Sequence, residues 1–226
     1  MPSGKSTSRT ASLHIEAQCW ATGLRHVIGL DEVGRGTWAG PVVAGAVCLP
    51  PDHHDLREVL TGVRDSKTMT PRQRSRLAET IHSTAVAHGI GQASSAEIDA
   101  IGIVPATRLA MQRALEAAGC SPDYLLLDSI QWPDLTIPHQ SIIKGDALSL
   151  SIASASVLAK VFRDDLMREY DQHYPGYGFG QHKGYGTPQH HAALREHGAC
   201  AIHRQSFAPI RNLEISQPPL PGEMTP

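Results

Sequence analysis

The sequence has little cysteine and no long apolar run. Its four cysteines are scattered without a C-x-x-C pair, so we expect free thiols rather than a disulfide framework or a zinc site. No stretch is long enough to span a bilayer, and no apolar run follows the basic residues of the first ten positions. We therefore expect a cytoplasmic protein without a secretory signal or a membrane-spanning segment.

The sequence also lacks a strong net charge, which is −2 with histidines counted as neutral. This balance does not indicate a nucleic-acid-binding protein. It does not exclude one either, because phosphates are bound by local basic patches and by cations rather than by the total charge.

Strands and helices alternate along most of the chain, and 41% hydrophobic residues suit one domain of good size. We expect this domain at 23–212, after a flexible segment at 1–22 and before a disordered tail at 213–226. The predicted strands are 27–30, 42–49, 90–93, 124–127 and 141–143, and the predicted helices are 71–88, 103–118, 148–170 and a short one from 188. The first two strands predict an antiparallel hairpin. The whole pattern predicts an α/β fold, a mixed sheet flanked by helices.

Acidic residues follow three of the predicted strands. Asp31 and Glu32 come directly after the first strand, Asp128 comes directly after the fourth, and Asp146 comes shortly after the fifth. We expect these acids to meet at one edge of the sheet, where unpaired carboxylates would be costly without a cation. Oxygen-only ligands favour Mg²⁺ or Mn²⁺, and two such ions can support hydrolysis of a phosphodiester.

Two of these positions have a further interpretation. Asp146 stands before the predicted long helix, where Asp is a favourable N-cap, although the other acids make a shared metal site the better interpretation. Asp31 and Glu32 are adjacent, and adjacent strand residues point to opposite faces. They can share a metal only if the backbone bends, which Gly34 and Gly36 permit.

The turn from Gly34 through Gly36 to Ala39 fits a dinucleotide-binding pattern. That interpretation requires a helix at the turn, whereas 42–47 predicts a strand, and the neighbouring acids would repel a pyrophosphate. A turn with little side-chain bulk suits instead the wide minor groove of an A-form helix, where main-chain groups can meet 2′-hydroxyls. Arg35 is then available to hold a phosphate.

Five stretches between positions 26 and 211 resemble the bacterial ribonuclease HII family. They are GLDEVGRGTWAGPVVAGAV, DSKTMTPRQR, EIDAIGIVPATRLAMQRAL, KGDALSLSIASASVLAKVFRD, and GYGFGQHKGYGTPQHHAAL with the closing HRQSFAPI. The first and fourth are highly specific. The resemblance implies a ribonuclease-H-like fold with a small helical C-terminal segment.

The same resemblance implies an endonuclease that hydrolyses the RNA strand of RNA–DNA hybrids and nicks duplex DNA at embedded ribonucleotides. It implies that Asp31, Glu32, Asp128 and Asp146 are the catalytic and metal-binding residues and that the products carry 5′-phosphate and 3′-hydroxyl ends. We expect a monomer that uses Mg²⁺ or Mn²⁺, binds no membrane and needs no organic cofactor.

The resemblance also implies substrate-binding roles. The Gly-Arg-Gly element at 34–36 reads the ribose and Tyr185 stacks on the adjoining deoxyribose, although a tyrosine between glycines also suits the filling of a surface gap. Lys67 is a candidate contact to the nucleic-acid backbone, with an exposed loop lysine as an equal alternative. His203 and Arg204 either contact phosphates or pack within the C-terminal segment.

Three other functions stay open at this point: another nuclease or strand-transfer enzyme on the same scaffold, a non-catalytic hybrid-binding module, and a nucleotide-cofactor enzyme. The Gly-Arg-Gly element and Tyr185 argue against the first, and the acidic set argues against the second. Ser129 and Ile130 follow Asp128 where the family usually has a glycine-containing turn, which leaves the conformation of this loop open.

Overall fold

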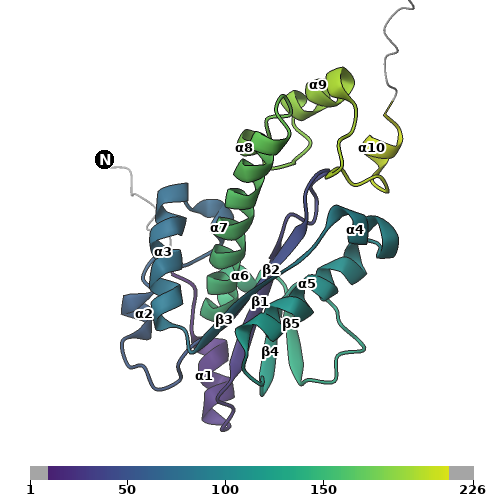
Figure 1. Ribbon diagram of the computed structural model, residues 1–226. Coiled ribbons are helices and arrows are strands. Elements are labelled where there is room, and N and C mark those ends of the chain that lie inside the picture. Colours follow the sequence, from purple (N-terminus) through teal and green to yellow (C-terminus); the bar gives the residue numbers. More distant parts are fainter. Residues whose placement is uncertain (1–9, 214–226) are drawn as a thin grey trace, which may run out of the picture.

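A computed structural model describes residues 10–213 and has a mixed sheet of five strands in the order β3-β2-β1-β4-β5 (Figure 1). β1 pairs antiparallel with β2 and β2 pairs antiparallel with β3, whereas β4 runs parallel to β1 and β5 runs parallel to β4. The strands are β1 Val27–Val33, β2 Val42–Cys48, β3 Ala87–Ala93, β4 Tyr124–Asp128 and β5 His139–Ile142. The predicted α/β class and the predicted first hairpin are confirmed.

Helices cover both faces of this sheet (Figure 1). They are α1 His14–Ala21, α2 Leu56–Val59, α3 Pro71–Thr84, α4 Ser95–Ile101, α5 Ile103–Ala118, α6 Gly145–Leu148, α7 Leu150–His173, α8 Phe179–His182, α9 Pro188–His197 and α10 Ala208–Arg211, with a 3₁₀ turn η1 at Ser66–Thr68. Helix α5 packs on β2 and β3, α7 packs on β1 and β2, and α3 packs on α7.

The alternation of side chains along β1 separates two cores. Ile28 and Leu30 pack in one cluster with Met111 of α5. Gly29, between them, faces α7 so closely that an added Cβ would lie 2.3 Å from the backbone nitrogen of Ile152. The small residues at the start of α7 thus allow this helix to approach the sheet closely, and β1 has a glycine at the contact.

Reciprocal capping begins two helices, α3 and α4, and α3 starts at Pro71 as predicted. The Thr70 side chain accepts from the Gln73 backbone N–H while the Gln73 side chain accepts from the Thr70 backbone N–H, and Ser94 with Glu97 does the same for α4. Helix α3 ends at Thr84, before the predicted end at 88, because the residues that follow pair with β2 as strand β3.

The predicted flexible segment at 1–22 is wrong for its second half. Residues 14–21 form α1, in which Glu16 is buried and its Oε1 accepts from Ser149 Oγ at 2.6 Å and Ser151 N at 2.9 Å. These partners are more than a hundred residues away in sequence. A local sequence pattern carries no information on such distant partners, and for that reason it predicts no ordered structure for this segment. Residues 1–9 and nearly all of the predicted tail, from 214 onward, lie outside the described residues.

The predicted helical C-terminal segment is present beyond α7. Helices α8, α9 and α10 surround a small core that contains Phe179, Leu194 and Ile202 and packs on Met167 of α7. All four cysteines are free, as predicted. Among residues 10–213, no helix combines the length and apolar character that a bilayer crossing requires.

Candidate active site

Strand β1 carries the first two predicted acids within its paired region. The strand continues past Leu30 to Val33, with Asp31 opposite Gly45 and Glu32 opposite Ala44 on β2. The backbone therefore does not bend between the two acids as expected, because both residues pair regularly with β2. Asp31 lies on the α7 face, as Gly29 does, and Glu32 lies on the other face.

Three of the four predicted acids converge. One carboxylate oxygen from each of Asp31, Asp128 and Asp146 lies within 4.8 Å of the others. Asp128 ends β4, the parallel neighbour of β1, and Asp146 lies in α6 just after β5. The predicted meeting of acids at one edge of the sheet is thereby confirmed for these three.

The N-cap interpretation of Asp146 is wrong. Helix α7 begins after Ser149, whose side chain accepts from Ile152 N at 3.2 Å. Asp146 instead lies in the short α6, buried and free to face the other carboxylates.

The loop after Asp128 is tied to the site by hydrogen bonds. Asp128 Oδ1 accepts from the backbone N–H of Gly145 at 2.7 Å, and Ser129 N donates to Ile142 O at 3.0 Å. Ser129 has a φ of 51°, in the left-handed region that favours glycine. Ser129 therefore adopts, with some strain, the backbone conformation that a glycine would adopt in this turn, and its hydrogen bond helps to keep Asp128 in place.

The electrostatics of this cluster disfavour three negative charges without a cation. Burial raises the pKa of Asp31 well above its usual value, and the charges of Glu32, Asp128 and Asp146 raise it further, while a hydrogen bond from Ser156 lowers it. Burial also raises the pKa of Asp146, and the charge of Asp128 adds to that effect.

Lys67 supplies a nearby positive charge. Its Nζ lies 4.0 Å from Asp146 Oδ2, and its side chain is exposed. Burial alone would lower the pKa of Lys67, but the surrounding carboxylates, led by Asp31, raise it overall. The structure thus places Lys67 at the rim of the acidic cluster rather than in an isolated loop.

Glu32 is not a member of the three-carboxylate cluster. Its Oε1 lies 3.7 Å from Arg35 Nη1, and its Oε2 is buried without a hydrogen-bond partner among the described residues. Burial raises its pKa, an effect that Arg35 partly offsets and Asp128 strengthens. An unpartnered buried carboxylate oxygen beside three other acids is a group that a cation would satisfy.

The donor set therefore fits a hard divalent cation. Every candidate ligand is a carboxylate oxygen, which suits Mg²⁺ or Mn²⁺ and disfavours zinc. The buried Asp31, held at the centre of the sheet, would be the ligand most dependent on such an ion for its ionised form.

The predicted substrate-reading turn lies between β1 and β2. Gly34 is buried, Arg35 and Gly36 are exposed, and Gly34 O accepts from Thr37 N at 3.4 Å. No helix opens at this turn, since β2 follows it directly, so the dinucleotide interpretation is wrong.

Tyr185 lies in the loop after α8 and is 40% exposed. Its loop contacts the turn, because Trp38 N donates to Gly184 O at 2.8 Å. The structure therefore joins the two elements that the resemblance assigns to the substrate.

Sequence reasoning missed the supporting roles of Arg163, His190 and Ser156, and it left two interpretations of Arg204 open. Arg204 and Arg163 are fully buried and donate to backbone carbonyls of the turn, and His190 contacts Tyr185 O at 3.0 Å. Ser156 hydrogen-bonds to Asp31. Of the two interpretations of Arg204, packing within the C-terminal segment is confirmed, because its guanidinium lies 5.1 Å from the ring centre of Phe207. The HRQSF motif was the available signal, but it does not say where the arginine points.

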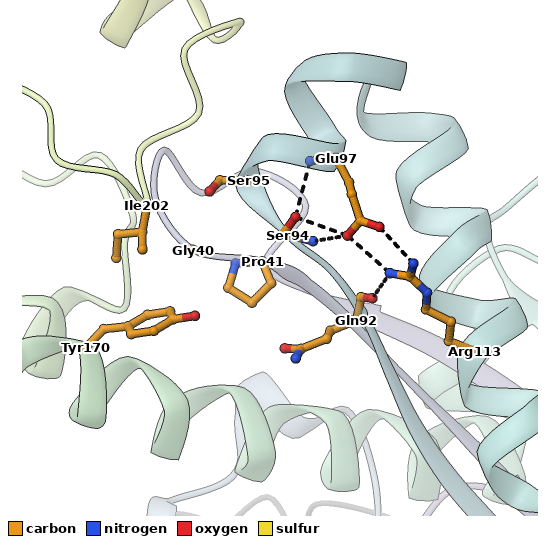
Figure 2. A pocket seen from close by; sticks show the side chains of 9 residues that line it. All are labelled: Gly40, Pro41, Gln92, Ser94, Ser95, Glu97, Arg113, Tyr170 and Ile202. Carbon is orange, nitrogen blue, oxygen red and sulfur yellow. Dashed lines mark hydrogen bonds and ion pairs between the residues drawn. The ribbon is translucent and has the colours of Figure 1, made fainter. Parts of the chain in front are cut away.

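A separate pocket of about 270 Å³ lies beside Gly40 and Pro41 (Figure 2). Figure 2 shows Glu97 hydrogen-bonded to Ser94 and paired with Arg113 on one wall, across from Tyr170. The charged groups of this wall satisfy one another, and none of the predicted acidic ligands lines the pocket. The pocket is therefore distinct from the acidic site.

Comparison with known proteins agrees with this geometry. The model of the family described as Ribonuclease HII matches residues 28–210. The ribonuclease HII of Synechococcus sp. (strain JA-3-3Ab) is 51% identical over 206 residues, which cover 91% of this chain and 92% of that relative.

Two solved structures share the fold. The ribonuclease H2 of Pyrococcus horikoshii OT3 is similar with a TM-score of 0.69 and 25% identity over 82% of this chain and 95% of that chain. Bst ribonuclease HIII, solved in complex with Mn²⁺, has a TM-score of 0.61 and 18% identity over 93% of this chain and 72% of that chain. Because the family model spans most of the sequence and a close relative matches nearly its full length, the chain belongs to the ribonuclease HII family.

Proposed function

We propose that this member of the ribonuclease HII family hydrolyses the RNA strand of RNA–DNA hybrids and nicks duplex DNA at embedded ribonucleotides, leaving 5′-phosphate and 3′-hydroxyl ends. The observation that carries the proposal is the convergence of Asp31, Asp128 and Asp146 within 4.8 Å beside a turn of low side-chain bulk. Phosphodiester hydrolysis needs concentrated positive charge and an activated water, and these carboxylates have the composition to hold the ions concerned.

The proposed ligands are Asp31, Asp128 and Asp146, with Glu32 as a fourth carboxylate. Mg²⁺ or Mn²⁺ fits this oxygen-only set, and the Bst ribonuclease HIII structure was solved with Mn²⁺. When bound, such ions lower the pKa of water and neutralise charge on the scissile phosphate.

The chain's own residues would prepare the site for this chemistry. The hydrogen bond from Ser156 favours the ionised form of Asp31. The Gly145 N–H donates to Asp128 Oδ1 at 2.7 Å and so fixes the position of that carboxylate. Lys67, at the rim, would attract the nucleic-acid backbone and offset part of the acidic repulsion.

The substrate-reading residues are proposed to be Gly34, Arg35, Gly36 and Tyr185. Exposed main-chain groups of the turn suit a 2′-hydroxyl, which distinguishes RNA from DNA, and the exposed ring of Tyr185 suits stacking on the adjoining deoxyribose. The direct hydrogen bond between the turn and the Tyr185 loop supports their action on neighbouring nucleotides.

A duplex with one embedded ribonucleotide tests the proposal, assayed with Mg²⁺ for the parent chain, Asp31→Asn, and the surface control Asp165→Asn. The parent and Asp165→Asn should nick on the 5′ side of the ribonucleotide, and Asp31→Asn should show almost no nicking. Equal nicking by Asp31→Asn would refute its assignment.

An all-DNA duplex of the same sequence separates the alternative function. Another nuclease or strand-transfer enzyme on this scaffold would act on the all-DNA duplex, whereas the proposed enzyme should leave it intact. Binding of Mn²⁺, followed by electron paramagnetic resonance, provides a readout besides activity. Asp128→Asn should weaken that binding, and unchanged binding would exclude Asp128 as a ligand.

A further inference from the structure

We propose that Arg204 and Arg163 are positioning residues that hold the Gly34–Gly36 turn and the Tyr185 loop together as one ribonucleotide-reading unit. This inference rests on the proposed function of those two elements. Arg204 and Arg163 are fully buried, and within residues 10–213 neither forms an ion pair with a carboxylate.

Burying a guanidinium without a counter-charge is costly unless its donors are satisfied. Burial lowers the pKa of Arg163 to about 10 and that of Arg204 to about 9, so both remain charged at neutral pH. Their donors bind backbone carbonyls instead of carboxylates, and the planar fork of arginine suits such a set of fixed acceptors. The positions of those carbonyls therefore depend on these two side chains.

Arg204 determines the orientation of the turn. Its Nη2 donates to Gly34 O at 2.6 Å, its Nη1 to Arg35 O at 2.8 Å, and its Nε to Gly40 O at 3.0 Å. Because the N–H and C=O of a planar trans peptide point in opposite directions, a Gly34 carbonyl directed inward directs the Arg35 N–H outward. The inward carbonyl of Arg35 does the same for the Gly36 N–H.

Two adjacent amide donors are thus presented at the surface. Arg35 and Gly36 are exposed, and neither N–H donates to another group in the described part of the chain. A Cβ added to Gly36 would meet nothing within 4 Å, so a ligand can approach this backbone closely. Outward amides of this kind suit the oxygen atoms of a ribose or a phosphate.

Arg163 joins the turn to the Tyr185 loop. Its Nη2 donates to Thr37 Oγ1 at 2.9 Å and Ala39 O at 3.1 Å on the turn side, and its Nη1 donates to Lys183 O at 2.9 Å on the loop side. Arg163 packs closely against the turn, because a Cβ added to Gly34 would lie 2.1 Å from Arg163 Nε. Displacing one element would therefore break hydrogen bonds to the other.

A pair of histidines holds the loop from its other side. Cys200 N donates to His203 Nδ1 at 2.9 Å, His203 Nε2 and His190 Nε2 lie 3.0 Å apart, and His190 Nδ1 lies 3.0 Å from Tyr185 O. One neutral tautomer of each ring satisfies all three contacts, with His203 donating to His190 and His190 donating to Tyr185 O. The backbone of Tyr185 is thereby fixed between Arg163 and this pair.

The test compares Arg204→Lys and Arg163→Lys with the control Arg113→Lys on a duplex that contains one ribonucleotide. Arg113 also binds a backbone carbonyl, Gln92 O at 2.7 Å, but contacts neither the turn nor the Tyr185 loop. Lysine keeps the positive charge of arginine but lacks the planar guanidinium group that donates to several carbonyls at once. We expect kcat/KM to fall about a hundredfold for Arg204→Lys, the loss that a displacement of about 1 Å can cause. The control should retain parental activity.

Two further measurements distinguish positioning from general stability. Mn²⁺ affinity should be unchanged in both variants, and hydrogen exchange should quicken at the turn amides Thr37, Trp38 and Gly40 while the amides of the central strands stay protected. Combining Arg163→Lys with Tyr185→Ala should cost less than the product of the single losses, because both changes disable the same unit.

The results that overturn the inference are specific. Parental kcat/KM for Arg204→Lys would overturn it, and so would unchanged hydrogen exchange at the turn amides of the lysine variants. A loss of Mn²⁺ affinity that parallels the loss of activity would also overturn it. Loss of amide protection in the central strands of both lysine variants would show that the two arginines support the whole fold instead. If the parent itself does not nick the duplex, the proposed function fails. If the parent nicks and Arg204→Lys equals it, only this inference fails.

Discussion

Replacing Asp31 by Asn should stabilise the metal-free protein at neutral pH while abolishing activity. Asp31 is 3% exposed and lies within 4.8 Å of the carboxylates of Asp128 and Asp146. Two unit charges at that distance repel by about 3.5 kcal/mol at an effective dielectric constant of roughly 20. Lys67 and proton uptake offset much of this repulsion. We therefore expect a net gain of about 1–2 kcal/mol, the size common for substitutions that relieve a functional site.

The gain should depend on pH in a defined direction. The folded-state pKa of Asp31 lies well above the ordinary value of 3.8, so the folded state binds more protons than the unfolded state between pH 3.8 and the raised pKa. The stability contribution of Asp31 therefore falls as pH rises through that interval, and Asn does not titrate. The advantage of Asp31→Asn should be full above the raised pKa and absent below 3.8.

Thermal unfolding in the presence of a chelator measures this effect. At about pH 7.5 the melting temperature of Asp31→Asn should exceed that of the parent by roughly 2–8 °C, and the gap should close as the pH is lowered. Added Mg²⁺ or Mn²⁺ should then raise the melting temperature of the parent more than that of the variant. A variant that melts below the parent at neutral pH without metal would contradict the proposed carboxylate repulsion, as would a difference in melting temperature that does not change with pH.

Three further predictions concern the surroundings of the site. Ser156→Ala removes the hydrogen bond that lowers the pKa of Asp31, so the acidic limb of the pH–rate profile should move to higher pH; an unmoved limb would exclude that role. Tyr185→Ala should lower kcat/KM at a single ribonucleotide about tenfold through lost stacking, with an unchanged melting temperature because the ring is exposed; parental kcat/KM would argue for mere gap filling. Gly29→Ala should lower the melting temperature strongly, because its Cβ would lie 2.3 Å from the α7 backbone, whereas Gly36→Ala should fold normally and lose ribonucleotide cleavage. Equal melting temperatures for the two glycine variants would contradict the packing of α7 on β1.

Local chemistry determined much of this protein from the sequence alone. Helix α3 begins at Pro71 as predicted, because the capping hydrogen bonds between Thr70 and Gln73 join residues three apart. The apolar runs before Asp31 and Asp128 predicted buried neighbouring strands, which bring both carboxylates to the same edge of the sheet. The acidic site was therefore largely predictable, because it depends on strand ends that a short window of sequence reveals.

Tertiary structure decided what depends on distant partners. The pairing of β1 with β2 extended the strand through Glu32, which placed that carboxylate on the face opposite Asp31 and outside the close cluster. Glu16 of helix α1 accepts hydrogen bonds from Ser149 and Ser151 at the start of α7, which ties this segment to the fold.

The same limit applies to Arg163 and Arg204. Arginine is rarely fully buried, so a sequence favours an exposed, phosphate-binding interpretation. Only the folded chain supplies the carbonyl groups that receive these guanidinium groups, and all of these carbonyls except that of Lys183 are more than a hundred residues away in sequence. Hydrogen bonds between residues so far apart produce no periodic pattern in the sequence. The contacts of Arg163 and Arg204 that hold the substrate-reading turn could therefore be found only in the tertiary structure.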